Sequence, residues 1–202
     1  HALHHKAREM VAQGDVGQVV FARAQLSCWY PDIPGAWRQD PKLGGGGALI
    51  DMATHGYDLL QYIVGSRVSE VMALTDTLTF GYPVEDSSTP LLRFENGAHG
   101  VVDAFFNVPD AAGQDRLEIY GNKGSIQAEG TIGPLPGGKM VAYTSDLARG
   151  YDPEQSKASL DVAVKEIDYT PVNMYAAELD HLSGCIDSGV AVGKSHFSIG
   201  PT

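Results

Sequence analysis

An aspartate and a histidine four residues apart are the side chains of this sequence best suited to acid–base chemistry. Asp51 and His55 lie one helical turn apart, and Asp58 follows three residues later on the same side. A neutral imidazole can accept a proton near pH 7, and a neighbouring carboxylate can set its tautomer and charge. The spacing therefore indicates a candidate acid–base pair, with Asp58 as structural support one turn further along.

Two other interpretations of this polar stripe stay open on spacing alone. A row of polar side chains opposite an apolar row is typical of any surface helix. Asp51 and His55 could also be two ligands of one metal ion, because helix residues four apart can share an ion. Such a site needs further ligands, and the sequence has no HExxH or CxxC motif to supply them. We therefore expect no metal.

One helix over 44–65 is expected to carry these residues. A flexible run of four glycines opens it, and Gly65 has the position of a C-terminal capping residue. Its side opposite Asp51 and His55 should pack on the core, because that side is apolar. The residues of this apolar face are Met52, Gly56, Leu59, Leu60 and Ile63.

An aromatic ring and a guanidinium group stand just ahead of the glycines. Trp37 and Arg38 lie in a proline-rich loop over 30–43. Beside an acid–base pair, these groups can hold a polyhydroxylated or carboxylated substrate. The sequence equally allows Trp37 to anchor the loop while Arg38 points into solvent. Both residues are candidates for substrate binding.

The glycine-led segment resembles the signature helix of the Gfo/Idh/MocA family of NAD(P)-dependent oxidoreductases. The shared pattern is Gly-Gly-Gly-x-x-x-Asp-x-x-x-His-x-x-Asp, which begins at Gly45. The helix and turn over 7–17, the Trp37-Arg38 pair, Phe-Glu-Asn-Gly-Ala at 94–98 and Ile-Tyr-Gly-Asn-Lys-Gly-Ser-Ile at 119–126 follow the family in order and spacing. The resemblance holds to about residue 130 and again in the last helix.

The resemblance implies a reaction and roles for the paired residues. The whole enzyme would transfer a hydride between nicotinamide and a hydroxyl-bearing carbon of a sugar, inositol or related polyol. His55 would take the hydroxyl proton. Asp51 would orient His55 or hydrogen-bond a neighbouring hydroxyl, and a lysine of the family's Glu-Lys-Pro segment would join them.

The nucleotide site of such an enzyme is expected outside this chain. No GxGxxG follows a predicted strand, and Gly44–Gly47 lie in a loop without the glycine three places later. The family's N-terminal Rossmann domain and its Glu-Lys-Pro segment are absent from the sequence. We expect residues 1–202 to form a single substrate-binding and oligomerisation domain that is inactive alone. NAD or NADP would bind only the full-length enzyme.

Apolar residues recur with a period of two after residue 65, which is typical of strands. Short strands joined by hairpins, with few helices, indicate an α+β fold with an open, mostly antiparallel sheet and helices on one face. The Asn96-Gly97 pair is a strong hairpin signal. Strands are expected at 16–29, 68–80, 91–94, 98–108, 116–120, 125–128, 140–143 and 162–169, and further helices at 3–13 and 173–188. The inner face of the last helix would carry Tyr175, Leu179, Leu182 and Ile186.

The strand at 68–80 predicts an assembly surface. Met72 and Leu74 would face the helices, while the other side carries a threonine ladder over 75–79. The predicted helices are too few to cover both faces of a wide sheet. An open face of threonines and scattered apolar side chains is a ready interface, so we expect a homodimer or tetramer built sheet against sheet.

Composition excludes several classes of partner. A formal net charge of −11 disfavours nucleic acid and acidic membrane surfaces, and no apolar run approaches the roughly 20 residues that span a bilayer. Cys28 and Cys185 fit no redox or zinc pattern, which favours a reduced, cytoplasmic protein. Two rival functions remain, a non-catalytic binding or scaffold domain of the same fold and a metal-dependent hydrolase with Asp51 and His55 as ligands.

Overall fold

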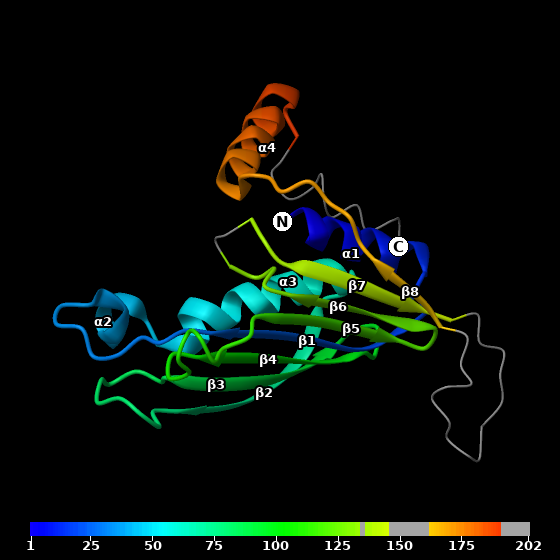
Figure 1. The fold of residues 1–202 in the computed structure, drawn as a ribbon. Coiled ribbons are helices and arrows are strands. Elements are labelled where there is room, and N and C mark those ends of the chain that lie inside the picture. The colour runs from blue at the N-terminus through cyan, green and yellow to red at the C-terminus, as the bar shows by residue number, and fades with distance from the viewer. Residues whose placement is uncertain (134–135, 146–161, 191–202) are drawn as a thin grey trace, which may run out of the picture.

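An open eight-stranded sheet forms the body of the computed structural model, which describes residues 1–133, 136–145 and 162–190 (Figure 1). The strand order is β2-β3-β4-β1-β5-β6-β7-β8, and only the pairing of β1 with β4 is parallel. The strands are β1 (Val19–Ser27), β2 (Val68–Asp76), β3 (Ser87–Phe94), β4 (His99–Phe105), β5 (Arg116–Gly121), β6 (Gly124–Glu129), β7 (Lys139–Thr144) and β8 (Ala163–Glu166). The helices are α1 (Ala2–Gln13), α2 (Pro41–Gly44), α3 (Thr54–Val64) and α4 (Met174–Ser188). The predicted α+β class is confirmed.

Two hairpins form where the turn residues predict them. Asn96 and Gly97 join β3 to β4, with Gly97 at a φ of +88° that favours glycine. The turn between Gly121 and Gly124 joins β5 to β6 in continuous antiparallel register. Residues 134–135, which follow β6, lie outside the described part of the chain.

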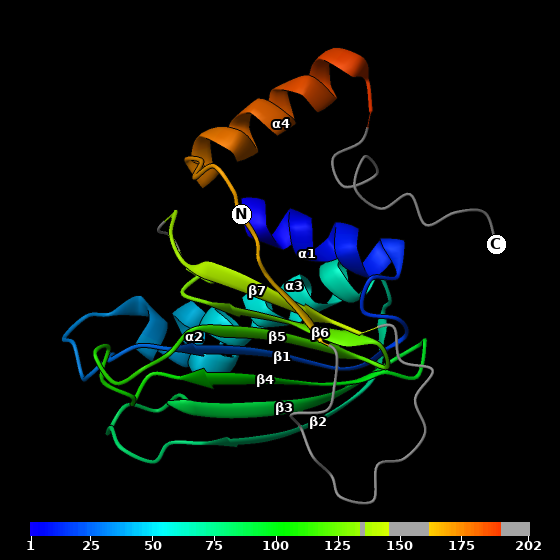
Figure 2. The same cartoon turned by 45° about the vertical axis from the view of Figure 1, so that its right-hand side comes forward.

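Helices α1 and α3 lie side by side on one face of the sheet (Figure 1, Figure 2). Helix α3 approaches the sheet closely at Gly56, where an added Cβ would lie 2.7 Å from Val102 Cγ1 and 3.2 Å from Ala24 Cβ. Leu60 and Ile63 continue this contact and are almost fully buried. Gly56 therefore lets α3 rest directly on β1 and β4, which fixes the direction in which the preceding residue, His55, faces.

The strand β1 departs from simple alternation near its start. A register shift against β5 between Val19 and Phe21 places Val19 in the core and leaves Val20 49% exposed. Simple alternation would place Val20 on the buried face with Ala22 and Ala24, and the register shift explains why it does not lie there. A bulge adds one residue to the strand and reverses the side-chain direction before it.

The strand β2 also faces opposite to expectation. Met72 lies directly across from Leu91, and Leu74 across from Thr89, all on the face that the helices leave open. Met72 and Leu74 are 72% and 76% exposed. The strand ends at Asp76, so the predicted threonine ladder does not form. Because β2 is an edge strand with exposed side chains on both faces, its hydrophobic pattern gave no information on which face was covered.

Helix α4 stands beyond α1, apart from the sheet, in both views (Figure 1, Figure 2). It begins at the predicted cap, where Asn173 Oδ1 accepts a hydrogen bond from the Ala176 N–H, and ends at Gly189. Its predicted inner face is exposed by between 41% and 70%, which corrects the expectation of core packing. These exposed side chains are Tyr175, Leu179, Leu182 and Ile186.

Candidate active site

The predicted helix over 44–65 starts later than expected, and a separate short helix, α2, precedes it. Helix α2 ends at Gly44, because Gly45 takes a left-handed conformation with a φ of +79°. Helical structure resumes at Ala48, and its first turn, Leu49–Ala53, is π-helical before α3 continues to Val64. The expected start at Gly44 was therefore wrong, whereas the end at Gly65 is confirmed. Single π turns inside helices are rare and occur frequently at functional sites.

The glycine run is closely packed, contrary to its expected flexibility. A Cβ on Gly44 would lie 3.0 Å from the backbone of both Trp37 and Arg38. A Cβ on Gly47 would lie 1.9 Å from the carbonyl oxygen of Glu85. The glycines thus let the backbone touch two distant segments, and this contact brings the Trp37-Arg38 loop against the start of the helix.

Arg38 joins two of the predicted site residues. Its Nε donates a hydrogen bond of 2.7 Å to Asp51 Oδ1, and its guanidinium carbon lies 4.3 Å from the centre of the Trp37 ring. The hydrogen bond to Asp51 raises the pKa of Arg38, and Tyr30 adds to this effect. Arg38 and Asp51 keep 40% and 32% of their side-chain surface exposed. The three side chains form a charged and aromatic cluster that is open to solvent, which we call the Trp37–Arg38–Asp51 cluster.

His55 lies on the exposed side of α3, as predicted. Within residues 1–133, 136–145 and 162–190, its ring has no hydrogen bond or ion pair to a side chain or to the backbone. Asp51 is bonded to Arg38 and not to His55. Asp58 is likewise exposed, and the described chain places no bonding partner on it. Both ring nitrogens of His55 are therefore accessible to a ligand.

Cys28, which is partly buried, lies near Asp51 and Met52. The thiol of Cys28 lies 3.8 Å from the Met52 sulfur. Burial raises the pKa of Cys28 to about 11, and the nearby carboxylates of Asp110, Asp51 and Asp115 contribute. The thiol is thus protonated at neutral pH and acts as a small apolar group near Asp51. No pattern in the sequence indicates that Cys28 would lie near Asp51.

Glu85 is the residue at this site that the sequence analysis missed. It lies between β2 and β3, and its Oε1 accepts hydrogen bonds from the N–H groups of Gly47 and Leu49 at 2.8 and 3.0 Å. No sequence signal marks it, because the contact spans 36 to 38 residues and ends on backbone groups.

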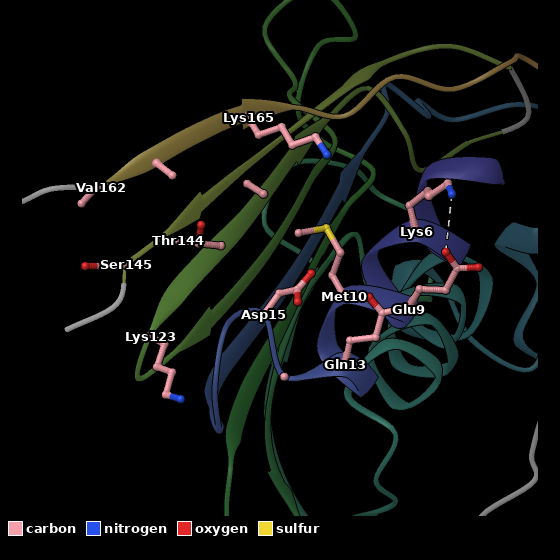
Figure 3. A pocket seen from close by; sticks show the side chains of 13 residues that line it. Lys6, Glu9, Met10, Gln13, Asp15, Lys123, Thr144, Ser145, Val162 and Lys165 are labelled. Carbon is pink, nitrogen blue, oxygen red and sulfur yellow. Dashed lines mark ion pairs between the residues drawn. The ribbon is translucent and has the colours of Figure 1, made fainter. Parts of the chain in front are cut away.

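A separate cleft of about 1080 Å³ lies between α1 and strands β7 and β8 (Figure 3). Lys6 and Glu9 form an ion pair of 3.5 Å on its helix wall, and Lys165 extends from β8 on the other side. None of the predicted site residues lines this cleft. The large volume of this cleft is therefore no evidence that it is the active site.

Neither a metal centre nor a membrane segment is evident in the described part of the chain. No three His, Cys, Asp or Glu side chains in it are grouped closely enough to hold a metal ion. None of its helices combines the length and the apolar character needed to cross a bilayer.

Fold and site together define an α+β domain that presents a histidine and a carboxylate from a glycine-led helix on one face of an open sheet. A family model described as the GFO/IDH/MocA C-terminal domain matches residues 4–127. The chain belongs to this family.

Similar proteins include sugar oxidoreductases. Levoglucosan dehydrogenase of Pseudarthrobacter phenanthrenivorans is 30% identical over 146 residues, which cover 59% of this chain and 37% of that protein. The structure of aldose-aldose oxidoreductase from Caulobacter crescentus with glycerol superposes with a TM-score of 0.75 at 26% identity, covering 94% of this chain and 51% of that one. A levoglucosan dehydrogenase complex with NADH has a TM-score of 0.64 at 26% identity, covering 82% of this chain and 43% of the other. The chain thus spans about half the length of these relatives or less.

Proposed function

We propose that this chain is the substrate-binding and catalytic half of an NAD(P)-dependent oxidoreductase that acts on a hydroxyl-bearing carbon of a sugar, inositol or related polyol. The observation that carries the proposal is the exposed, unbonded His55 on the same helical segment as Asp51. Residues 1–202 serve as one substrate and oligomerisation domain, and the nucleotide domain belongs to the remainder of the whole protein. The similarity to dehydrogenases supports this assignment.

Each residue of the site has a role in this proposal. His55 accepts the proton of the substrate hydroxyl as the carbon is oxidised, since its ring nitrogens are free in the described structure. Asp51 uses Oδ1 for Arg38, so Oδ2 is available to hydrogen-bond a neighbouring hydroxyl or to orient His55. Trp37, which is 51% exposed, offers a flat surface to the sugar ring.

The charge balance of the cluster favours a neutral polyol over a carboxylated substrate. Arg38 already pairs with Asp51, so its positive charge is compensated and its Nε donor is used. An incoming carboxylate would have to displace Asp51 or share its cation. Hydroxyl groups need only single donors and acceptors, which Asp51, His55 and the outer nitrogens of Arg38 provide.

The test of the reaction is an assay of the whole enzyme with NAD and NADP. Levoglucosan, myo-inositol and glucose should serve as a first panel of oxidation substrates, followed spectroscopically by reduction of the nicotinamide. Turnover of one of them supports the proposal. Absence of turnover across a broad polyol panel, with the protein folded, favours the non-catalytic binding domain instead. Metal analysis of the purified protein addresses the metal-dependent hydrolase, which requires a stoichiometric bound ion.

We expect no nucleotide phosphate site at the glycine run of this chain. Phosphate-binding glycine turns use free backbone N–H groups, whereas those of Gly47 and Leu49 are bonded to the carboxylate of Glu85. An anion placed there would meet a negative charge. We therefore propose that the nicotinamide cofactor, which exchanges hydride with the substrate carbon, is held by another part of the whole enzyme.

We accordingly expect this chain alone to bind neither NAD nor NADP appreciably. Isothermal titration of the purified chain with NAD, NADH and NADPH should give only heats of dilution. The whole enzyme is the positive control. Micromolar binding to the isolated chain would contradict the expectation.

The proposal includes assembly through the open face of the sheet. The structure places Met72 and Leu74 on this face, where the sequence predicted a threonine ladder. Met72, Leu74 and Leu91 are each more than half exposed on this face. Leu91 lies across from Val101 in the β3–β4 pairing. Exposed apolar side chains that are contiguous on a sheet are characteristic of interfaces. We propose that two copies of the chain pair through them, as a dimer or as part of a tetramer.

The chain alone should therefore be a dimer or larger in light scattering. Leu74→Asp places a charge on the apolar face and should give monomers, because burying an unpaired carboxylate is costly. Leu43→Asp is the matched control, since Leu43 is 68% exposed but lies on α2, away from the sheet. A wild-type chain that stays monomeric at high concentration would show that this face is solvated.

A further inference from the structure

We infer that Glu85 is a positioning residue that holds the turn carrying Asp51 in its working geometry. The inference rests on the proposed function of Asp51 and His55. It concerns a residue that lies outside the glycine/Asp/His pattern and comes from a different part of the chain.

Glu85 satisfies three consecutive backbone donors at the start of the site helix. Its Oε1 accepts the N–H groups of Gly47 and Leu49, and its carbonyl oxygen accepts the Ala48 N–H at 2.9 Å. The first N–H groups of a helix have no partner inside it. Ala48 offers no side-chain cap, so Glu85 performs the capping from outside. Its negative charge also complements the positive end of the helix dipole.

The capped residues lead directly to Asp51. The Asp51 N–H bonds to the Gly47 carbonyl oxygen at 2.9 Å, so the position of Gly47 sets the first bond of the turn that carries Asp51. This turn is the π-helical one, Leu49–Ala53. A π turn is less favourable than a regular helical turn and persists where its surroundings hold it. Glu85 supplies that support from the adjacent loop.

Glu85 is itself held rigidly by its neighbour. Asp86 is fully buried, and its carboxylate accepts the N–H groups of Leu78, Thr79 and Phe80 at 2.8 to 3.0 Å and the side-chain amide of Asn107 at 3.1 Å. The Asp86 carbonyl oxygen accepts the Phe106 N–H at 2.8 Å. A buried carboxylate with four donors is a rigid anchor. The loop before β3 is thus fixed to the end of β4, and this attachment holds the adjacent Glu85 in place.

Hydrogen–deuterium exchange of the amides at 47–53 tests this support without any assay of activity. Glu85→Ala removes the side-chain acceptor, and exchange there should rise by about 5- to 30-fold, as expected for the loss of a helix cap. Glu85→Gln keeps a carbonyl oxygen at the same place and should restore most of the protection. Glu95→Ala, at an exposed glutamate of the β3–β4 turn, is the matched control and should change nothing.

A second variant approaches the same contact from the other side. Gly47→Ala would place a Cβ against the Glu85 carbonyl oxygen and force the two segments apart. Its exchange pattern over 47–53 should match that of Glu85→Ala. In both variants the amides of β5 and β6 should keep their wild-type rates. Unchanged exchange at 47–53, or equal acceleration throughout the chain, would overturn the inference.

Kinetics of the whole enzyme then separate positioning from a purely structural contribution. Glu85→Ala should lower kcat about tenfold with little change in KM, and Glu85→Gln should recover most of the loss. Accelerated exchange at 47–53 with wild-type kcat would show that the turn need not be held for catalysis, and would overturn the positioning role. If the wild-type enzyme shows no oxidoreductase activity at all, the proposed function fails, while the exchange data still decide whether Glu85 holds the turn.

Discussion

Replacement of His55 by alanine in the whole enzyme is expected to lower kcat by about 10²–10⁴-fold, the usual contribution of a general base. The side chain is exposed and unbonded in the described structure, so its removal leaves no buried group without a partner. Folding should therefore be unaffected. The effect should appear in the rate of polyol oxidation and much less in KM, because the proton moves only as the carbon is oxidised.

A matched variant separates the role of His55 from a general effect of losing a histidine. His99 is exposed at the start of β4, on the open side of the sheet, and the described residues give it no bonding partner. His99→Ala should keep wild-type turnover. Near-wild-type turnover of His55→Ala on the true substrate would show that another group accepts the proton.

The second large effect is expected from the pair formed by Asp51 and Arg38. Asp51→Asn retains the shape of the side chain but removes its charge, and should reduce kcat/KM about tenfold. A charge-assisted hydrogen bond contributes about 1.5–3 kcal/mol, and partial exposure places this pair at the lower end. Arg38→Gln should cost a similar factor, since it releases Asp51 and uncovers the Trp37 ring.

A double-mutant cycle reveals whether the two residues act as one unit. If they do, the enzyme with both substitutions should lose no more activity than the more affected single variant. Independent, multiplicative losses would mean that Asp51 and Arg38 serve the substrate separately. Thermal unfolding of each variant is the control, and it should show only small shifts because both side chains are partly exposed.

The sequence predicted most of the fold because local signals and global packing agree in it. Alternating apolar residues marked the strands, Asn96-Gly97 marked a hairpin, and Gly65 marked the end of the site helix. These signals act over a few residues and depend little on the rest of the chain. The sequence therefore predicted the helix that carries Asp51 and His55. It did not predict the π-helical form of the first turn.

Features that depend on distant partners could not be predicted. The bulge after Val19 follows from pairing with β5, and the outward direction of Met72 follows from pairing with β3. The close packing of Gly47 reflects contact with Glu85, which is remote in sequence. The hydrophobic pattern of one segment does not reveal which distant segment will pack against it. The sequence identified the candidate site residues, whereas the hydrogen bond between Arg38 and Asp51 is seen only in the structure.

Rescue by external imidazole tests the central claim most directly. In the whole enzyme with His55→Ala, the vacated position is open to solvent, so added imidazole can reach it. We predict that imidazole raises the turnover of this variant in proportion to its concentration and leaves wild type and His99→Ala unchanged. An inactive His55→Ala enzyme that imidazole does not restore, although folded and able to bind the polyol, would contradict the assignment of His55 as the proton acceptor.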